Sequence, residues 1–199
     1  MYSQNNEEEI ILRVFGDKVG RFLDIGACDG ITNSNTLALV ERCWSGVLVE
    51  PSPGSFMALE ARHGKNPKLK LVHAAVGACC GLTEFWDSPI TFGYDTTERS
   101  NRNKWDHLAK FRRPYFVPTI LIEQLLATFG NSFDFISIDT EGTSAGLFGL
   151  LPLTIGLRPR VICVEHDGHF SECLGKATAH GYREISRNAE NLIFERVDT

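Results

Sequence analysis

Four groups of polar residues follow predicted buried strands and have the side chains needed for ligand binding and proton transfer. The first is the segment DIGACDG, residues 24–30, and the second is Glu50, which ends the apolar run GVLVE. The third is DTEG, residues 139–142, and the fourth is EHDGH, residues 165–169. In sheets of parallel strands, ligands bind beyond the carboxyl ends of the strands. We therefore expect these groups to meet at one site.

The first segment differs from a dinucleotide-binding loop. That loop has the pattern G-x-G-x-x-G, but after Gly26 this chain has Cys28 and Ile31 at the other two glycine positions. The second glycine lets the backbone approach a pyrophosphate, so Cys28 fits that role poorly. The pattern D-x-G-x-x-x-G favours a ligand without phosphates whose amino-acid part lies along the loop, with Asp24 holding an ammonium group. The alternative is an ordinary glycine-rich turn.

Glu50 has the position of a ribose-binding acid. A carboxylate at the end of a second strand has two oxygens, which can accept hydrogen bonds from two adjacent hydroxyl groups. The negative charge of Glu50 disfavours a cofactor that carries a phosphate on the ribose 2′ position, because the two negative charges would repel. The alternative is a solvated carboxylate at the end of a strand.

The last two groups supply candidates for catalysis. Asp139 and Glu141 stand two residues apart at the exit of the apolar run FDFISI, which needs no charge there for its stability. His166 can be a base, a hydrogen-bond donor or a metal ligand. The alternatives are a helix N-cap for the first pair and a polar loop for the histidine. A divalent cation is not predicted but stays open, with the ligands drawn from Asp139, Glu141, His166, Asp167 and His169.

Short apolar runs alternate with helical patterns along the chain, which predicts an α/β fold with a mostly parallel sheet covered on both faces. Strands are expected at 21–26, 46–50, 69–76, 133–139 and 160–165, with a short extra strand at 82–86. Helices are expected at 7–15, 36–42, 55–63, 120–129, 144–151 and 170–180. The last two strands, 182–186 and 191–196, are joined by a short loop and must form an antiparallel hairpin.

Six segments in this order resemble the FkbM family of S-adenosylmethionine-dependent methyltransferases: FLDIGACDG, VLVEPSPGSFMALEA, VHAAVG, TILIEQLL, FDFISIDTEG and VICVEHDG. The resemblance runs from about Arg21 to Asp167. It implies a three-layer, Rossmann-like class I methyltransferase fold with S-adenosylmethionine as cofactor. It also implies transfer of a methyl group to a hydroxyl oxygen on a sugar or other small metabolite.

Carried over by position, the resemblance assigns roles to individual residues. Asp24, Gly26 and Asp29 would line the methionine part of the cofactor, Glu50 the ribose and Ala75 the adenine. Asp139 and Glu141 would face the reaction centre. The expected cofactor-binding residues are thus Asp24, Gly26, Ala27, Cys28, Asp29, Glu50, Pro51, Ala75 and Asp139, and the candidate catalytic residues are Asp139, Glu141 and His166.

Three other functions stay open. An NAD-dependent oxidoreductase would share the fold and the acid after the second strand, but the second and third glycines are missing. A catalytically silent binding module would keep the fold for a contact with a partner. A methyltransferase acting on nitrogen or on a macromolecule is a third alternative, although no N-P-P-Y-type motif follows the fourth long strand.

Length and charge limit the remaining possibilities. The chain has 199 residues, of which 43% are hydrophobic, and this size predicts one domain over residues 1–199. Its net charge of −5 argues against a nucleic-acid partner. Residues 1–20 would carry an N-terminal helix, and residues 87–117 an insertion or lid loop. Within it, the stretch 98–113 has a net charge of +4, which suggests an anionic small-molecule acceptor. The alternative is a solvated helix or loop. A homo-oligomer stays open.

The chain shows no sign of export or of a membrane anchor. It has no signal-like N-terminus, no apolar stretch of about 20 residues and no C-x-x-C pair. We therefore expect a cytoplasmic protein without a membrane partner.

Overall fold

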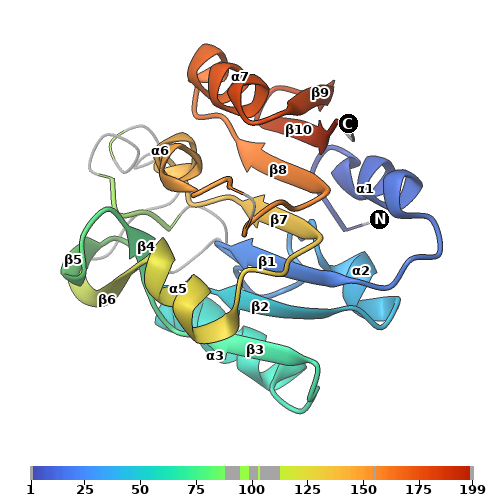
Figure 1. Ribbon diagram of the computed structural model, residues 1–199. Helices are drawn as coiled ribbons and strands as arrows, with labels where there is room; N and C mark the ends of the chain where they lie inside the picture. Colours follow the sequence, from blue (N-terminus) through green and yellow to red (C-terminus); the bar gives the residue numbers. More distant parts are fainter. Residues whose placement is uncertain (1, 88–94, 99–102, 104–112, 155, 198–199) are drawn as a thin grey trace.

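A computed structural model describes residues 2–87, 95–98, 103, 113–154 and 156–197 (Figure 1). Most of the insertion, including nearly all of the basic stretch 98–113, lies outside these residues. Among the helices within these described residues, none is long and apolar enough to cross a membrane.

The described residues form a seven-stranded sheet in the order β3-β2-β1-β7-β8-β10-β9. Its first five strands pair in parallel, and β10 pairs antiparallel with both β8 and β9. The prediction of a mostly parallel sheet that ends in an antiparallel hairpin is confirmed. The strands are β1 (Arg21–Ile25), β2 (Ser45–Val49), β3 (Leu69–Val72), β7 (Phe135–Ile138), β8 (Val161–Glu165), β9 (Tyr182–Arg187) and β10 (Asn191–Arg196).

Helices cover both faces of this sheet, as the alternation of apolar runs predicts (Figure 1). On one face, α1 (Glu7–Phe15), α2 (Leu37–Glu41) and α3 (Pro53–His63) pack Ile11, Leu39 and Leu59 against the strands. On the other face, α5 (Ile122–Phe129), α6 (Ser144–Leu150) and α7 (Phe170–Ala179) pack apolar residues in the same way. Successive side chains of a strand point to opposite faces, so each central strand contributes to both cores.

A second sheet of three strands, in the order β4-β6-β5, was not predicted. The run 69–76 is one strand in the prediction but two in the structure, because β4 (Ala75–Gly77) leaves β3 and pairs with β6 (Tyr115–Leu121). The extra strand predicted at 82–86 is β5 (Gly81–Phe85), which pairs with β6 on its other side. The helix predicted from residue 120 begins at Ile122 because β6 continues to Leu121.

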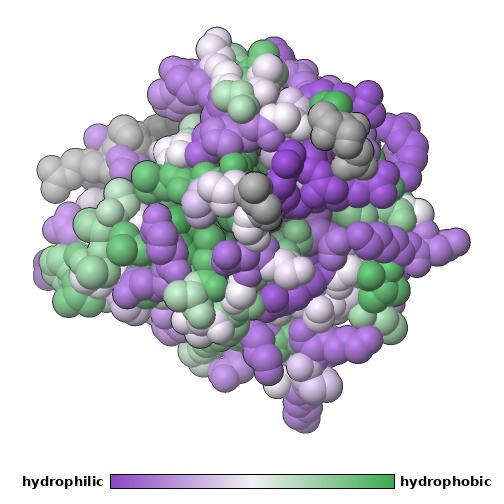
Figure 2. All heavy atoms as spheres, in the orientation of Figure 1, coloured by the Kyte–Doolittle hydropathy of each residue, from purple (hydrophilic) through white to green (hydrophobic). Residues whose placement is uncertain are grey.

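The two faces of this small sheet differ in polarity. Phe85, Val117 and Tyr115 form a small core with Ala75, whereas Leu82 and Phe116 lie on the opposite face and are 71% and 64% exposed. Figure 2 shows apolar surface over β5 and β6, at the left of the view.

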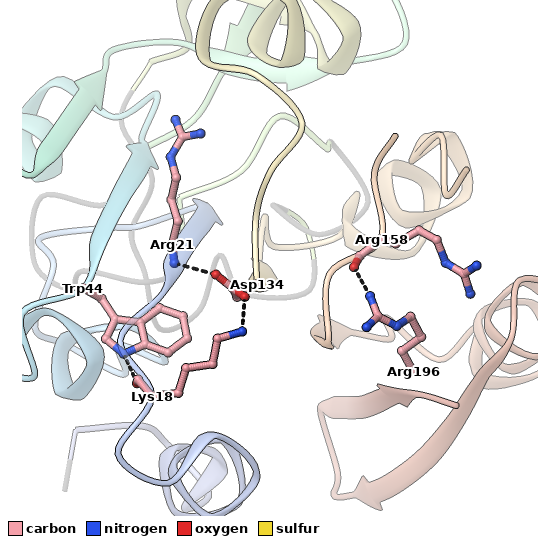
Figure 3. Close-up of polar contacts among 6 residues, drawn as sticks. All are labelled: Lys18, Arg21, Trp44, Asp134, Arg158 and Arg196. Atoms are coloured by element: carbon pink, nitrogen blue, oxygen red, sulfur yellow. Dashed lines mark hydrogen bonds and ion pairs between the residues drawn. The ribbon is translucent and has the colours of Figure 1, made fainter. Parts of the chain in front are cut away.

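A polar network holds the amino ends of the central strands together (Figure 3). The Asp134 carboxylate accepts a hydrogen bond from the Arg21 backbone N–H at 3.0 Å and forms an ion pair with Lys18 at 2.6 Å. Trp44 Nε1 donates to the Lys18 carbonyl at 3.0 Å. These contacts fix β1 against β7 at the edge of the sheet away from the polar groups identified in the sequence.

Candidate active site

A cavity of about 650 Å³ opens at the carboxyl ends of β1, β2, β7 and β8. It brings together all four groups of polar residues from the sequence. The predicted site residues on its wall are Asp24, Gly26, Ala27, Cys28, Glu50, Pro51, Ala75, Asp139, Glu141, His166, Asp167 and His169.

The wall of this cavity is strongly acidic. Its described lining residues include eight carboxyl groups and neither lysine nor arginine. The eight acids are Asp24, Glu50, Asp95, Asp139, Glu141, Glu165, Asp167 and Glu190. A cavity with this balance of charge attracts cations and repels phosphate groups.

The first loop requires glycine at position 26. Gly26 has a φ of +91°, and a Cβ built there would lie 1.6 Å from the backbone oxygen of Asp139. The Gly26 and Ala27 N–H groups both donate to the Val49 carbonyl at the end of β2. The glycine therefore lets the loop after β1 pass directly over the end of β7.

Asp24 lies at the inner wall of the cavity and is 5% exposed. Its carboxyl oxygen Oδ2 accepts a hydrogen bond from Thr36 Oγ1 at 2.6 Å. Burial raises its pKa to about 6. A positive group of a ligand would favour the charged form.

Asp29 is the exception among the predicted site residues, because it is not among the residues that line the cavity. Its carboxylate accepts hydrogen bonds from the backbone N–H groups of Ile31 and Thr32, at 2.9 and 2.7 Å. In this structure Asp29 therefore shapes the loop. Its predicted contact with the methionine part of a cofactor stays a prediction.

Glu50 is held in a fixed orientation by the backbone. Its Oε2 accepts from the Cys28 N–H at 2.8 Å and its Oε1 from the Ser52 N–H at 2.7 Å. Each carboxylate oxygen can accept a second hydrogen bond, so both stay able to bind a hydroxyl group. Burial raises the pKa of Glu50 to about 8.

An apolar part of the wall lies beside these acids. It contains Ala74, Ala75 and Val76, together with Phe85 from β5. Ala75 is the residue expected next to an adenine, whereas Phe85 was missed because only the second sheet brings it here. Small side chains and one aromatic ring leave space for a flat apolar group.

Three carboxyl groups gather at the ends of β7 and β8. Asp139, Glu141 and Glu165 each offer an oxygen within 4.8 Å of the others. Burial and the Glu141 carboxylate raise the pKa of Asp139 to about 8. Burial and the neighbouring Asp139 raise the pKa of Glu165 as well. Of the open cation ligands, only Asp139 and Glu141 belong to this group, and Glu165 is the third member.

Glu165 was missed as a site residue. The parallel register pairs Ile138 with Val164, so the residues that follow, Asp139 and Glu165, stand side by side. The sequence does show that Asp139 and Glu165 each follow a predicted buried strand, and this pattern could have identified Glu165 as a site residue.

His166 has one ring nitrogen already engaged. Nδ1 accepts a hydrogen bond from the Gly168 N–H at 3.0 Å, which places the ring proton on Nε2. Nε2 is buried and has no hydrogen-bond partner among the described residues. This tautomer makes His166 a donor, and it disfavours the role of base.

A mostly parallel seven-stranded sheet with this strand order and an antiparallel hairpin at one edge defines the Rossmann-like methyltransferase fold. The chain belongs to the FkbM family of methyltransferases, because the family model "Methyltransferase FkbM domain" matches residues 24–184. The resemblance noted in the sequence is thus confirmed, and with it the fold. No curated protein matches the chain.

Solved structures agree with this fold at low sequence identity. The crystal structure of monomeric WbdD matches with a TM-score of 0.55 and 11% sequence identity. The match covers 96% of this chain and 41% of the WbdD chain. A putative RNA methyltransferase from Pyrococcus horikoshii matches with a TM-score of 0.51 and 11% identity, covering 96% of this chain and 83% of the other. The putative methyltransferase yhhF from Escherichia coli has the same score and identity, with coverage of 98% and 88%.

Proposed function

We propose that this protein transfers a methyl group from S-adenosylmethionine to a hydroxyl oxygen of a small molecule. The observation that carries the proposal is the acidic cavity, in which eight carboxyl groups face no lysine or arginine among the described lining residues. S-adenosylmethionine carries a positive sulfonium and a positive ammonium group, which such a wall attracts.

The same observation disfavours an NAD-dependent oxidoreductase. NAD carries a pyrophosphate, which needs backbone N–H groups or cationic side chains around it. Here the loop after β1 has Cys28 where a second glycine would admit the phosphates, and carboxylates surround it.

Within this proposal, each part of the wall has a role. Asp24 binds the ammonium group, and both oxygens of Glu50 accept hydrogen bonds from the ribose hydroxyls. The adenine lies against Ala75 and Phe85. These contacts hold the methyl donor in one orientation, and alignment of two reactants can contribute about 7–11 kcal/mol to catalysis.

The chemistry supplied by the donor is an activated methyl group on positively charged sulfur. The protein must then align the acceptor and accept the proton that its hydroxyl loses as the new bond forms. The carboxyl groups after β7 and β8 are the candidates for that proton.

We propose a sugar or another small metabolite as the acceptor. An anionic acceptor would need the basic stretch 98–113, because the described lining residues include neither lysine nor arginine. A labelled methyl donor and a panel of neutral and acidic sugars would separate these acceptors. Transfer only to amines would contradict the proposal of O-methylation.

Binding of the donor can be tested without knowing the acceptor. Isothermal titration calorimetry should detect S-adenosylhomocysteine and S-adenosylmethionine but not NAD. Above pH 8, where Glu50 is ionised, Glu50→Gln should weaken both by about 10- to 100-fold, since a hydrogen bond to a charged group contributes roughly 1.5–3 kcal/mol. The control is Glu123→Gln, an exposed carboxylate on α5. Binding of NAD with no binding of the adenosyl ligands would refute the proposal.

A further inference from the structure

One part of the cavity wall has neutral polar side chains instead of acids. The lining residues there are amides and hydroxyls from two short segments: Gln4, Thr32, Asn33, Ser34 and Asn35. Gln4 and Asn33 are exposed, and no hydrogen bond within the described residues engages the side-chain amide of either. The NH₂ group of an amide has two hydrogen-bond donors, so both side chains are available to bind a negatively charged group.

The segment 2–6, which contains Gln4, connects two other parts of the cavity rim. Ser3 forms a parallel β-bridge with Asn33, so Gln4 comes directly beside the neutral residues that precede α2. Asn5 Nδ2 donates to a carboxylate oxygen of Glu190, in the turn between β9 and β10, at 2.7 Å. The segment 2–6 therefore lies against the loop after β1 and against the turn before β10.

A buried carboxylate fixes this segment in place. Glu7 is 1% exposed, and its Oε2 accepts a hydrogen bond from the Asn5 N–H at 2.8 Å. Its Oε1 accepts from Asn188 Nδ2 and Asn191 Nδ2, at 2.7 and 2.9 Å. A buried and fully hydrogen-bonded group of this kind holds the segments that it joins in one arrangement. Gln4 is thus presented to the cavity from a fixed backbone.

The ligand group that fits these neutral donors is a carboxylate. In the proposed complex, the ammonium group of the methyl donor binds Asp24, and the donor's carboxylate is bonded to the same carbon atom as that ammonium. Asp24 is hydrogen-bonded to Thr36, which directly follows the neutral residues 32–35. The acids elsewhere on the wall would repel a carboxylate. The neutral amides are therefore where the described wall can accept it.

We propose that the segment 2–6 is part of the methyl-donor site and that Gln4, together with Asn33, binds the carboxylate of the donor's amino-acid part. This inference rests on the proposed function, because it requires the adenosyl ligand to lie in this cavity. The family model matches residues 24–184, so Gln4 lies outside the part of the chain that it covers. Gln4 makes the site selective for an adenosyl ligand with a complete amino-acid group.

Two ligands that differ only in this carboxylate test the proposal: S-adenosylmethionine and its decarboxylated form. Both carry the sulfonium and the ammonium group. In isothermal titration calorimetry, Gln4→Ala should weaken S-adenosylmethionine about 10-fold, because a hydrogen bond to a charged group is lost, and should leave the decarboxylated ligand within about twofold. Gln4→Glu should weaken S-adenosylmethionine further and bind the decarboxylated ligand more tightly, because the new charge repels only the former's carboxylate.

Asn6→Asp is the matched control for the added charge. Asn6 is exposed, is not among the lining residues, and makes no side-chain capping hydrogen bond to α1. The ratio of the two affinities should stay within about twofold of the wild type, because salt screens an exposed charge outside the cavity. Thermal unfolding should show that the variants at both exposed positions are folded.

The outcomes separate the inference from the proposed function. An equal loss of affinity for both ligands in Gln4→Ala, or no loss for either, would overturn the inference. Failure of the wild type to bind either ligand would contradict the proposed function instead.

A second measurement locates the contact directly. In nitrogen-15 spectra of the wild type, the side-chain amide signal of Gln4 should shift on addition of S-adenosylmethionine and shift much less with the decarboxylated ligand. The Asn6 amide signal should stay in place with both. Equal shifts of the Gln4 signal with the two ligands would show that it does not bind the carboxylate.

Discussion

At the scale of single residues, the site contains buried carboxyl groups. Their burial is unfavourable for folding, but it places them where a ligand can bind. Asp139 is the clearest case, because its pKa lies at about 8 in the folded protein and near 3.8 in an unfolded chain. The folded state therefore binds more protons than the unfolded state between these values. By linkage, the contribution of Asp139 to stability is present below pH 4 and is lost as the pH rises through about 8.

Asp139→Asn should therefore stabilise the free protein in a pH-dependent way. The gain over the wild type should grow between pH 4 and pH 8 and level off above that range, because the amide has no charge to bury. Urea unfolding at pH 5, 7 and 9 measures the difference in the free energy of unfolding between Asp139→Asn and the wild type. For the control Glu123→Gln, this difference should not grow with pH. A constant difference across these pH values would contradict the raised pKa of Asp139.

At the scale of elements, the loops after the strands and the small second sheet complete the site. Gly26 illustrates how closely they approach one another, since any side chain there would meet the Asp139 carbonyl. We expect Gly26→Ala to destabilise the protein by several kcal/mol and to abolish binding of S-adenosylhomocysteine. Gly146→Ala on α6, where nothing lies within 4 Å of an added Cβ, should instead stabilise it by about 0.5–1 kcal/mol. Equal changes in melting temperature for the two variants would contradict the close approach of Gly26 to the Asp139 carbonyl.

The second sheet makes a separate prediction. Phe85 is 2% exposed and lies both in the small core and on the cavity wall, so Phe85→Ala should cost about 3 kcal/mol and weaken adenosyl-ligand binding. Phe116→Ala, on the exposed face of the neighbouring strand, should change stability by less than about 0.5 kcal/mol. Urea unfolding and calorimetry together check both variants. Unchanged binding by Phe85→Ala would remove Phe85 from the proposed adenine pocket.

The elements also indicate which features could be predicted from sequence. Buried parallel strands are apolar runs, so the bounds of β1, β2, β7 and β8 were predicted to within two residues. The polar residues that follow each of these strands were also identified from the sequence. The strand β6 was missed because its apolar run continues directly into α5 and contains Pro118, a residue that is uncommon inside strands. The break between β3 and β4 has no local signal, since it depends on pairing with a strand some 40 residues away. Glu165 was missed for a related reason, as its significance depends on the register between β7 and β8.

At the scale of the whole molecule, the distribution of charge matters more than the net charge of −5. Carboxyl groups gather around the cavity, whereas at the opposite edge of the sheet acids are paired with cations, as in Asp134 with Lys18 (Figure 3). A bound cation should relieve the repulsion within the cavity. We therefore expect S-adenosylmethionine to raise the melting temperature by more at pH 8 than at pH 5, where Glu50 and Asp139 are protonated. A larger shift at pH 5, measured by thermal unfolding at equal ligand concentrations, would contradict this account.

The central claim is that the acidic cavity holds the methyl donor. A crystal structure of the protein with S-adenosylhomocysteine tests it most directly. The account predicts ribose hydroxyls on both oxygens of Glu50, the adenine against Ala75 and Phe85, and the sulfur facing Asp139 and Glu165. A ligand bound elsewhere at full occupancy, with this cavity filled only by water, would contradict the account.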